Sequence, residues 1–495
     1  MAKKETYQDE SLTRAQRLEA LIKKGINPYP SQSDRTHTII DLEDNLNKLK
    51  KSKKIILVGR VRSIRAHGGS SFAHIEDGTG RFQVYFKKDE LKKDLYKNFI
   101  ELIDVGDFIQ VTGSLFKTKK GEHTIMVNDW TLLSKTLSPM PEKWHGLQDI
   151  EARFRKRYLD LITNEEVREI FYARAAIVST IRMFLNEHGF LEVDTPELQP
   201  MPGGALAKPF VTHHNSLDTD LYLRIAPELY LKRLIVGGYE RVYEVARCFR
   251  NEGMDWSHNP EFTQVEFYAA YMDYEQLMDL TEDLILEIVK NVNDSNEIEY
   301  EGNKIKFKKK FKRVQFRQAL IDAADIDIEA YPDQKSIYKK AQKLGLKDIK
   351  PKDSRGKICD ELYKEFVRPN LVQPTFMIDH PVELSPLAKK KEDDPRYVER
   401  FQLVVGGGIE LVNAFSELND PIDQRERFNE QQEAAIAGDE EAHPIDDDFI
   451  EALEHGMPPT AGFGMGIDRL TSLLTNKKNI KEVILFPTLR PKDKS

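Results

Sequence analysis

The sequence has very few cysteines and no long apolar run. Of its 495 residues only Cys248 and Cys359 are cysteines, which excludes a disulfide framework. Neither has a C-x-x-C partner, so we expect no zinc. No apolar stretch approaches the roughly 18 residues that cross a bilayer, so no membrane association is expected. The first residues, Met1 to Glu5, lack the apolar core of a signal peptide, and these absences together predict a cytoplasmic protein.

The sequence also has fewer basic than acidic residues, 74 Lys and Arg against 82 Asp and Glu. The formal net charge is −8 at pH 7, which argues against binding nucleic acid through bulk positive charge. Lysines do cluster locally, at 48–54, 87–93, 117–120 and 306–312, while acidic residues dominate 439–454. Each lysine cluster taken singly is more simply a solvated face of a helix or loop. Any nucleic-acid partner is therefore expected to be bound locally.

The N-terminal third divides into a helical extension and a β-rich segment. Residues 10–25 predict an amphipathic helix within an extension that covers 1–54. Residues 55–140 then predict a small OB-type β-barrel, with a polar helical insertion near 88–104. The expected strands are 55–61, 72–76, 82–86, 107–113 and 124–130. Two prolines in the stretch 134–150 predict a linker there.

The remaining residues, 141–495, predict a second domain of mixed helix and strand. Thr163-x-x-Glu166 is a capping-box pattern that opens a helix ended by Gly189, and a strand over 190–196 follows. Polar residues at every second position predict strands in two further segments, and apolar spacing predicts helices in two others. The strands are expected in 221–272 and 398–418, the helices at 273–292 and 321–368, and a helical insertion over 300–397.

The most informative stretch runs from Phe249 to Tyr268. It reads Phe-Arg-Asn-Glu-Gly from 249, His-Asn-Pro-Glu-Phe-Thr from 258, and Glu-x-Tyr from 266. In an extended strand Arg250 and Glu252 point to one side, and an arginine fork suits a phosphate or carboxylate. A buried structural Arg–Glu pair is the alternative for these two residues alone. The full string resembles the second signature motif of class II aminoacyl-tRNA synthetases.

Two further segments carry the same resemblance. The string Gly-Phe-Gly-Met-Gly-Ile-Asp-Arg-Leu from Gly462 has Ile467 where a dinucleotide fingerprint needs glycine, so that interpretation fails. It is similar to the third class II motif, with Arg469 in the first helical turns. The helix and strand over 165–196 resemble the first motif, which forms the dimer interface in this class.

The chain is therefore identified as a member of class II, subclass IIb. The resemblance implies an α+β protein: an OB-fold anticodon-binding barrel, then a catalytic domain built on an antiparallel β-sheet flanked by helices. It implies ATP, tRNA and Mg²⁺ as partners and a homodimer. Arg250, His258 and Arg469 are the expected catalytic residues, since no side chain stands out as a nucleophile or base. The expected ATP-binding residues are Arg250, Glu252, His258, Asn259, Phe262, Glu410 and Arg469.

The string Asn-Ala-Phe-Ser-Glu-Leu-Asn-Asp from Asn413 resembles the lysine-specific members. A buried lysine ammonium needs at least one carboxylate and further acceptors. Glu266, Tyr268 and Glu417 meet that need, and Phe415 would line the aliphatic stem. The expected lysine-binding residues are Glu228, Arg250, Glu266, Tyr268, Asn413, Phe415 and Glu417. This implies ATP-dependent formation of lysyl-adenylate and pyrophosphate, then transfer of lysine to the 3′ end of tRNA(Lys).

The metal site departs from the relatives. The resemblance implies that Glu410 carries magnesium between the phosphates, with a second glutamate after an upstream Arg-Phe pair. This chain has Gln402 at that place and an apparent one-residue insertion before Glu410. Gln402 is expected to be at most a weaker ligand. Glu410 is also out of phase with Glu417 in a straight strand, so a bend between them is required.

Residues of the predicted barrel indicate that it binds the tRNA anticodon. Phe72 and Gln83 fall on neighbouring expected strands, and class IIb relatives use such residues to stack on and read the central anticodon base. Arg62 and Arg65 are expected phosphate or base contacts. Two alternatives remain open: a ligase that acts on a protein or forms an amide, whose relatives lack the barrel, and a catalytically silent RNA-binding protein.

Overall fold

The computed structural model describes residues 2–52, 54–92, 94–141, 147, 149–205, 207–436 and 445–491. The chain divides into two compact units, Met1–Leu147 and Gln148–Ser495. The linker predicted at 134–150 and the acidic stretch at 439–454 lie partly outside the described residues. None of the helices that the structure describes is long and apolar enough to cross a membrane.

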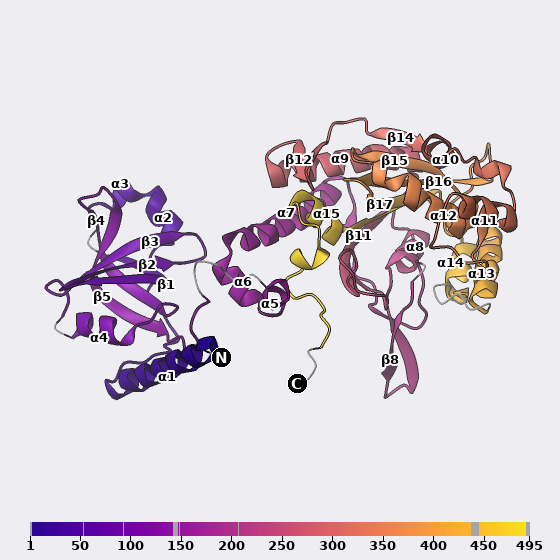
Figure 1. The fold of residues 1–495 in the computed structure, drawn as a ribbon. Coiled ribbons are helices and arrows are strands. Elements are labelled where there is room, and N and C mark those ends of the chain that lie inside the picture. The colour runs from indigo at the N-terminus through magenta and orange to yellow at the C-terminus, as the bar shows by residue number, and fades with distance from the viewer. Residues whose placement is uncertain are drawn as a thin grey trace. The chain divides into compact units, whose positions relative to one another are not determined.

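The first unit is a closed five-stranded barrel with helices beside it (Figure 1). The strand order is β1-β2-β3-β5-β4, and buried residues alternate with more exposed ones along β2. The OB-fold prediction is confirmed, with strands longer than expected because they bend around the barrel. The elements are α1 (Ala2–Lys23), α2 (Ile39–Asp44), α3 (Leu46–Leu49), β1 (Ile55–His67), β2 (Ser70–Glu76), β3 (Arg81–Lys87), α4 (Leu95–Leu102), β4 (Phe108–Lys117) and β5 (His123–Ser134).

The second unit is built on an eight-stranded sheet of order β14-β15-β16-β17-β18-β11-β10-β6. All neighbours are antiparallel except the two edge pairs, β14 with β15 and β10 with β6. The strands are β6 (Leu191–Glu192), β10 (Arg241–Phe249), β11 (Glu261–Ala270), β14 (Lys312–Gln315), β15 (Thr375–Pro381), β16 (Tyr397–Val405), β17 (Ile409–Ser416) and β18 (Thr460–Gly466).

Helices and two small sheets surround this sheet. The small sheets join β7 (Leu198–Gln199), β9 (Thr219–Leu223) and β8 (Phe210–His214), and β12 (Glu297–Tyr300) with β13 (Asn303–Lys306). The helices are α5 (Ile150–Arg155), α6 (Arg157–Thr163), α7 (Glu165–Glu187), α8 (Glu228–Val236), α9 (Tyr274–Asn293), α10 (Phe316–Ala324), α11 (Gln334–Lys343), α12 (Arg355–Phe366), α13 (Pro421–Ile436), α14 (Asp447–Glu454) and α15 (Ile467–Leu474).

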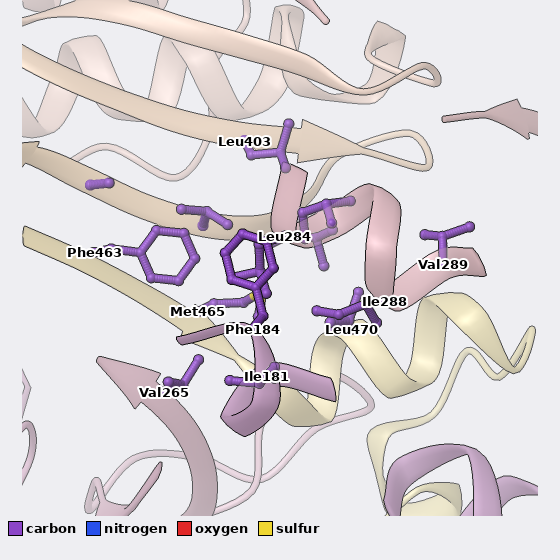
Figure 2. Packing of buried hydrophobic residues seen from close by; sticks show 14 of the residues in the cluster. Ile181, Phe184, Val265, Leu284, Ile288, Val289, Leu403, Phe463, Met465 and Leu470 are labelled. Atoms are coloured by element: carbon purple, nitrogen blue, oxygen red, sulfur yellow. The ribbon is translucent and has the colours of Figure 1, made fainter. Parts of the chain in front are cut away.

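The central strands have one apolar face and one polar face. Val265 on β11 and Phe463 and Met465 on β18 pack with residues of α7, α9 and α15 in the largest apolar cluster, as Figure 2 shows. Because side chains alternate along a strand, the residues between them point to the opposite face. Glu266 and Tyr268 are therefore presented on that second face, where the cavity described below lies.

Three local predictions were wrong. Thr163 does not cap α7: it ends α6, and its hydroxyl donates to the carbonyl of Leu159 at 2.9 Å, so Asn164 stands at the helix start instead. The segment 221–272 is not all strand, because α8 lies within it. The expected strand at 190–196 shortens to β6.

The segment 300–397 is not simply a helical insertion. It contributes β14 and β15 to the central sheet, and β15 pairs with β16 over most of its length. Its helices α10, α11 and α12 form a separate apolar cluster around Phe316 and Leu362. The lysine-rich composition of the segment concealed the short strands.

Candidate functional site

A cavity of about 420 Å³ lies on the polar face of the central sheet. Strands β11, β17 and β18 and the segment between β10 and β11 supply most of its walls, and Glu228 and Leu229 of α8 line one part of it. Gln402 is not among the described residues that line it. The cavity brings together the other predicted residues of the catalytic unit: Glu228, Arg250, Glu252, His258, Asn259, Phe262, Glu266, Tyr268, Glu410, Asn413, Phe415, Glu417 and Arg469.

Glycines on β18 make room for the deep part of this cavity. Gly462 pairs with Tyr268 on one side and with Phe415 on the other, and Gly464 pairs with Glu266 and Asn413. A Cβ atom at Gly462 would overlap the Glu417 carboxylate and the Tyr268 ring. The absence of side chains here therefore lets polar groups from neighbouring strands meet above β18.

Glu266 is a buried carboxylate held by two donors. It is 6 % exposed, and its Oε2 accepts from the Tyr268 hydroxyl at 3.2 Å. Its Oε1 accepts from Nε2 of Gln264 at 2.5 Å, a contact that the sequence analysis missed. Burial and, next in size, the nearby Glu228 carboxylate raise the pKa of Glu266 to about 8.

A buried lysine, also missed, stands at the closed end. Lys232 follows Glu228 by one turn of α8, and its Nζ donates to Glu228 Oε1 at 2.6 Å. The same ammonium forms an ion pair with Glu417, whose side chain is fully buried. Burial acts to lower the pKa of Lys232, but the carboxylates of Glu228 and Glu417 more than offset this, and the pKa is raised. Burial raises the pKa of Glu417, with the Lys232 ammonium acting against that rise.

The middle of the cavity is occupied by Arg250. Its guanidinium carbon lies 4.9 Å from the centre of the Phe262 ring, and its buried Nε has no hydrogen-bond partner within the described part of the chain. Asn259 donates through Nδ2 to the carbonyl of Glu261 at 2.6 Å. Arg250 therefore offers a planar cation, Phe262 an aromatic face and Asn259 an amide, in the same cavity as Glu266 and Glu417.

His258 lies at the open mouth. Asp255 contacts its Nδ1 at 3.0 Å and also accepts from the hydroxyl of Ser257 at 3.0 Å. Burial acts to raise the pKa of Asp255, but the hydrogen bonds from His258 and Ser257 lower it to about 2. Asp255 is therefore ionised and fixes the orientation of the imidazole.

Arg469 and Glu410 form the opposite wall. Nη1 of Arg469 donates to the backbone carbonyl of Glu410 at 3.2 Å. Leu403 pairs with Val412 and Val404 pairs with Glu410, so Leu411 is an extra residue in a β-bulge. The bulge is the bend that the phase of Glu410 and Glu417 required.

Arg400 orients Asn413. Its Nε donates to Asn413 Oδ1 at 2.8 Å, and its Nη1 donates to the carbonyl of Leu384 at 2.8 Å and to the Ser385 hydroxyl at 2.9 Å. Because Oδ1 already accepts from Arg400, the amide group of Asn413 remains as a donor. The sequence showed this arginine next to Phe401 but gave no sign of its partner.

Among the described residues, no group of three or more His, Cys, Asp or Glu side chains is arranged to hold a metal. Of the two predicted metal ligands, Glu410 lines the cavity beside Arg469. Its carboxylate is a hard oxygen ligand of the kind that Mg²⁺ accepts. Gln402 is buried beside His380, and the structure gives no support to it as a second ligand.

On the barrel, Phe72 is half-buried and its ring lies 4.5 Å from the Tyr85 ring on the next strand. Gln83 is nearly buried and donates from Nε2 to the Thr124 hydroxyl at 3.2 Å. Arg62 contacts Glu76 at 3.2 Å, whereas Arg65 is exposed and pairs with Phe72 across β1 and β2. Tyr85 extends the aromatic surface that the sequence analysis assigned to Phe72 alone.

Comparison with known proteins covers both units. Residues 149–490 match the family model described as tRNA synthetases class II (D, K and N), and residues 55–133 match that of the OB-fold nucleic acid binding domain. The lysine–tRNA ligase of Carboxydothermus hydrogenoformans is 51 % identical over 480 residues, 97 % of this chain and 98 % of that protein. The lysine–tRNA ligase of Moorella thermoacetica is 46 % identical over 491 residues, 99 % of this chain and 100 % of that protein.

Proposed function

Since the chain belongs to the class II tRNA synthetases of the D, K and N group, we propose that it is a lysine–tRNA ligase. It activates lysine with ATP and transfers it to tRNA(Lys) for protein synthesis. The observation that carries the choice of lysine is the pair of buried carboxylates, Glu266 and Glu417, lining one cavity with Arg250. Buried carboxylates without a cationic partner are costly, and a neutral isostere would leave Glu228, Glu266 and Glu417 with the Lys232 ammonium as their shared cation within the described cavity.

Lysine would lie along the deep part of the cavity. Glu266, Tyr268 and Glu417 bind its ε-ammonium group, and the Phe415 ring lies along its aliphatic stem. Glu228 accepts from the α-amino group. The free amide donor of Asn413, oriented by Arg400, suits the substrate carboxylate.

The first step joins the carboxylate to ATP. A carboxylate oxygen of lysine attacks the α-phosphorus, a new O–P bond forms, and the bond from that phosphorus to the pyrophosphate oxygen breaks. Catalysis consists of positioning and charge stabilisation. Arg250 binds the carboxylate and α-phosphate, and His258 and Arg469 stabilise charge on the departing phosphates. Phe262 stacks on adenine, while Glu252 and Asn259 bind its edge or the ribose.

Glu410 is the residue that would hold Mg²⁺ on the phosphates. The ion would neutralise phosphate charge when bound. In the second step the terminal 3′ ribose hydroxyl of tRNA attacks the lysyl carbonyl and releases AMP. Phe72, Gln83, Arg62 and Arg65 on the barrel bind the anticodon.

The anticodon assignment has a separate test. Phe72→Ala is expected to raise the tRNA KM by about 10- to 100-fold, because base stacking on an aromatic contributes about 1–3 kcal/mol. Lysine-dependent exchange of pyrophosphate into ATP does not involve tRNA and stays unchanged. Both are measured in one preparation, and a loss of exchange in this variant would contradict the assignment.

Two further properties belong to the proposal. A homodimer is supported by exposed apolar side chains on α7 and β6, the first-motif elements: Tyr172, Met183 and Leu191 are each about half exposed. A cytoplasmic location agrees with two free, buried cysteines.

Pyrophosphate exchange tests the proposed function. Labelled pyrophosphate is expected to enter ATP with lysine and at most weakly with arginine, ornithine or methionine. Exchange that depends on another amino acid would overturn the lysine assignment. No exchange with any amino acid would favour the silent RNA-binding protein.

A further inference from the structure

The amino-acid end of the cavity contains more negative charge than a single ammonium can balance. Three carboxylates, Glu228, Glu266 and Glu417, lie close enough to interact electrostatically, and each is at most 7 % exposed. Lys232 is the buried ammonium among them. Its Nζ also lies 5.5 Å from the centre of the Phe415 ring, which lines the cavity.

When all three carboxylates are ionised, as in the form that binds lysine, this arrangement leaves two negative charges for a ligand to neutralise. Lysine brings two ammonium groups, and its carboxylate is matched separately by Arg250. Without Lys232 the carboxylates would exceed the substrate's positive charge by one, and Glu228 and Glu417 would repel each other across the space that Lys232 fills. The ammonium also holds both carboxylates in place, because its side chain is fully buried between them and the sheet.

We propose that Lys232 is a specificity-determining positioning residue for the amino-acid substrate. It holds Glu228 and Glu417 apart at fixed positions and sets the charge of the cavity to match a diammonium amino acid. This inference rests on the proposed function. Lys232 itself remains in its ion pairs throughout and takes no part in bond formation.

The alternative is that Lys232 forms structural ion pairs that only stabilise the fold. The barrel offers a matched control: Lys135 is equally buried and is held by Asp104 and by Asp107, the latter at 2.7 Å. Loss of Lys135 removes the same kind of buried pair without touching the cavity. A purely structural role for Lys232 therefore predicts equal behaviour of the two variants.

The experiment compares Lys232→Met, Lys135→Met and the double variant Lys232→Met with Glu228→Gln. Exchange kinetics give KM for lysine and for ATP between pH 6.5 and 9. Lys232→Met is expected to raise the lysine KM at least about 30-fold and the ATP KM less than about threefold. Its lysine KM also falls more steeply with rising pH than that of the wild type, because one more proton must leave the carboxylates.

The double variant keeps the test decisive if Lys232→Met folds poorly. It removes a buried charge together with its partner, so it should fold. Its lysine KM stays high because Glu228 also contacts the α-amino group, but its pH dependence should return to the wild-type steepness, because one carboxylate fewer must lose a proton. Lys135→Met should lower the thermal midpoint and leave the lysine KM unchanged. A wild-type lysine KM and pH profile in folded Lys232→Met, or a double variant that keeps the steeper pH profile, would overturn the inference. Absence of lysine-dependent exchange in the wild type would instead overturn the proposed function.

Discussion

Replacing Arg250 by alanine is expected to abolish lysine-dependent exchange, lowering kcat/KM at least about 10³-fold. The guanidinium lies between the amino-acid end and the phosphate end of the cavity, with an unpartnered buried Nε in the described structure and the Phe262 ring beneath it. It contacts charge that moves in the transition state, and removing such a donor typically costs about 10²–10³ in rate. Loss of the contact between Arg250 and the carboxylate of the substrate lysine lowers kcat/KM further.

Arg247→Ala is the matched control. This arginine lies on β10, three residues before Arg250, but is exposed and pairs with Glu261 at 3.4 Å outside the cavity. Its exchange rate should equal that of the wild type, and both variants should have similar thermal midpoints. Turnover near the wild-type rate in folded Arg250→Ala would refute the assignment of this site.

Glu266→Gln should raise the lysine KM by about 10²- to 10³-fold with little change in the ATP KM. The amide keeps the shape of the side chain but removes the charge that faces the ε-ammonium group, and breaking a buried charge pair costs about 2–5 kcal/mol. The pH dependence is a second readout. In the free protein the pKa of Glu266 is raised to about 8. Burial, Glu228 and Glu244 raise this pKa, whereas Tyr268 and Arg250 lower it.

Lysine binds the ionised form, so affinity should increase as the pH rises toward 8. A pKa near 8 predicts about a fivefold gain between pH 7 and pH 8, together with proton release on binding. Glu266→Gln should lose this gain, whereas Glu261→Gln, at an exposed position on the same strand, should keep it. A flat wild-type profile, or an unchanged profile in Glu266→Gln, would contradict the role of this carboxylate.

Short sequence motifs predicted those site residues that lie close together in the sequence. The alternation in β11 placed Glu266 and Tyr268 on one face, and the mismatch in phase between Glu410 and Glu417 required the bulge at Leu411. Gln264 has the same parity as Glu266 and could have been found this way, but Lys232 could not. The ion pair of Lys232 depends on Glu417, directly after β17, lying beside α8 in the fold. The spacing of Lys232 from Glu228 carries meaning only once that segment is known to be helical.

The errors have the same origin. Leu231 and Ile235 are buried at helical spacing in α8, but in a short apolar segment they are equally compatible with a strand. Strand β15 joins the central sheet by pairing with β16, and the four-residue β14 joins by pairing with β15, about 60 residues further along the chain. The local pattern in 300–397 does not indicate these pairings. Gln402 was placed near the metal because it follows the Arg400–Phe401 pair, yet its side chain is buried beside His380 and does not line the cavity.

The most direct test of the account is a crystal structure with lysine and a non-hydrolysable ATP analogue. The ε-ammonium nitrogen is expected within hydrogen-bonding distance of Glu266, Tyr268 and Glu417, with the carboxylate on Arg250. A lysine that lies elsewhere, or whose ammonium group points into solvent while these carboxylates pair only with protein groups, would contradict it.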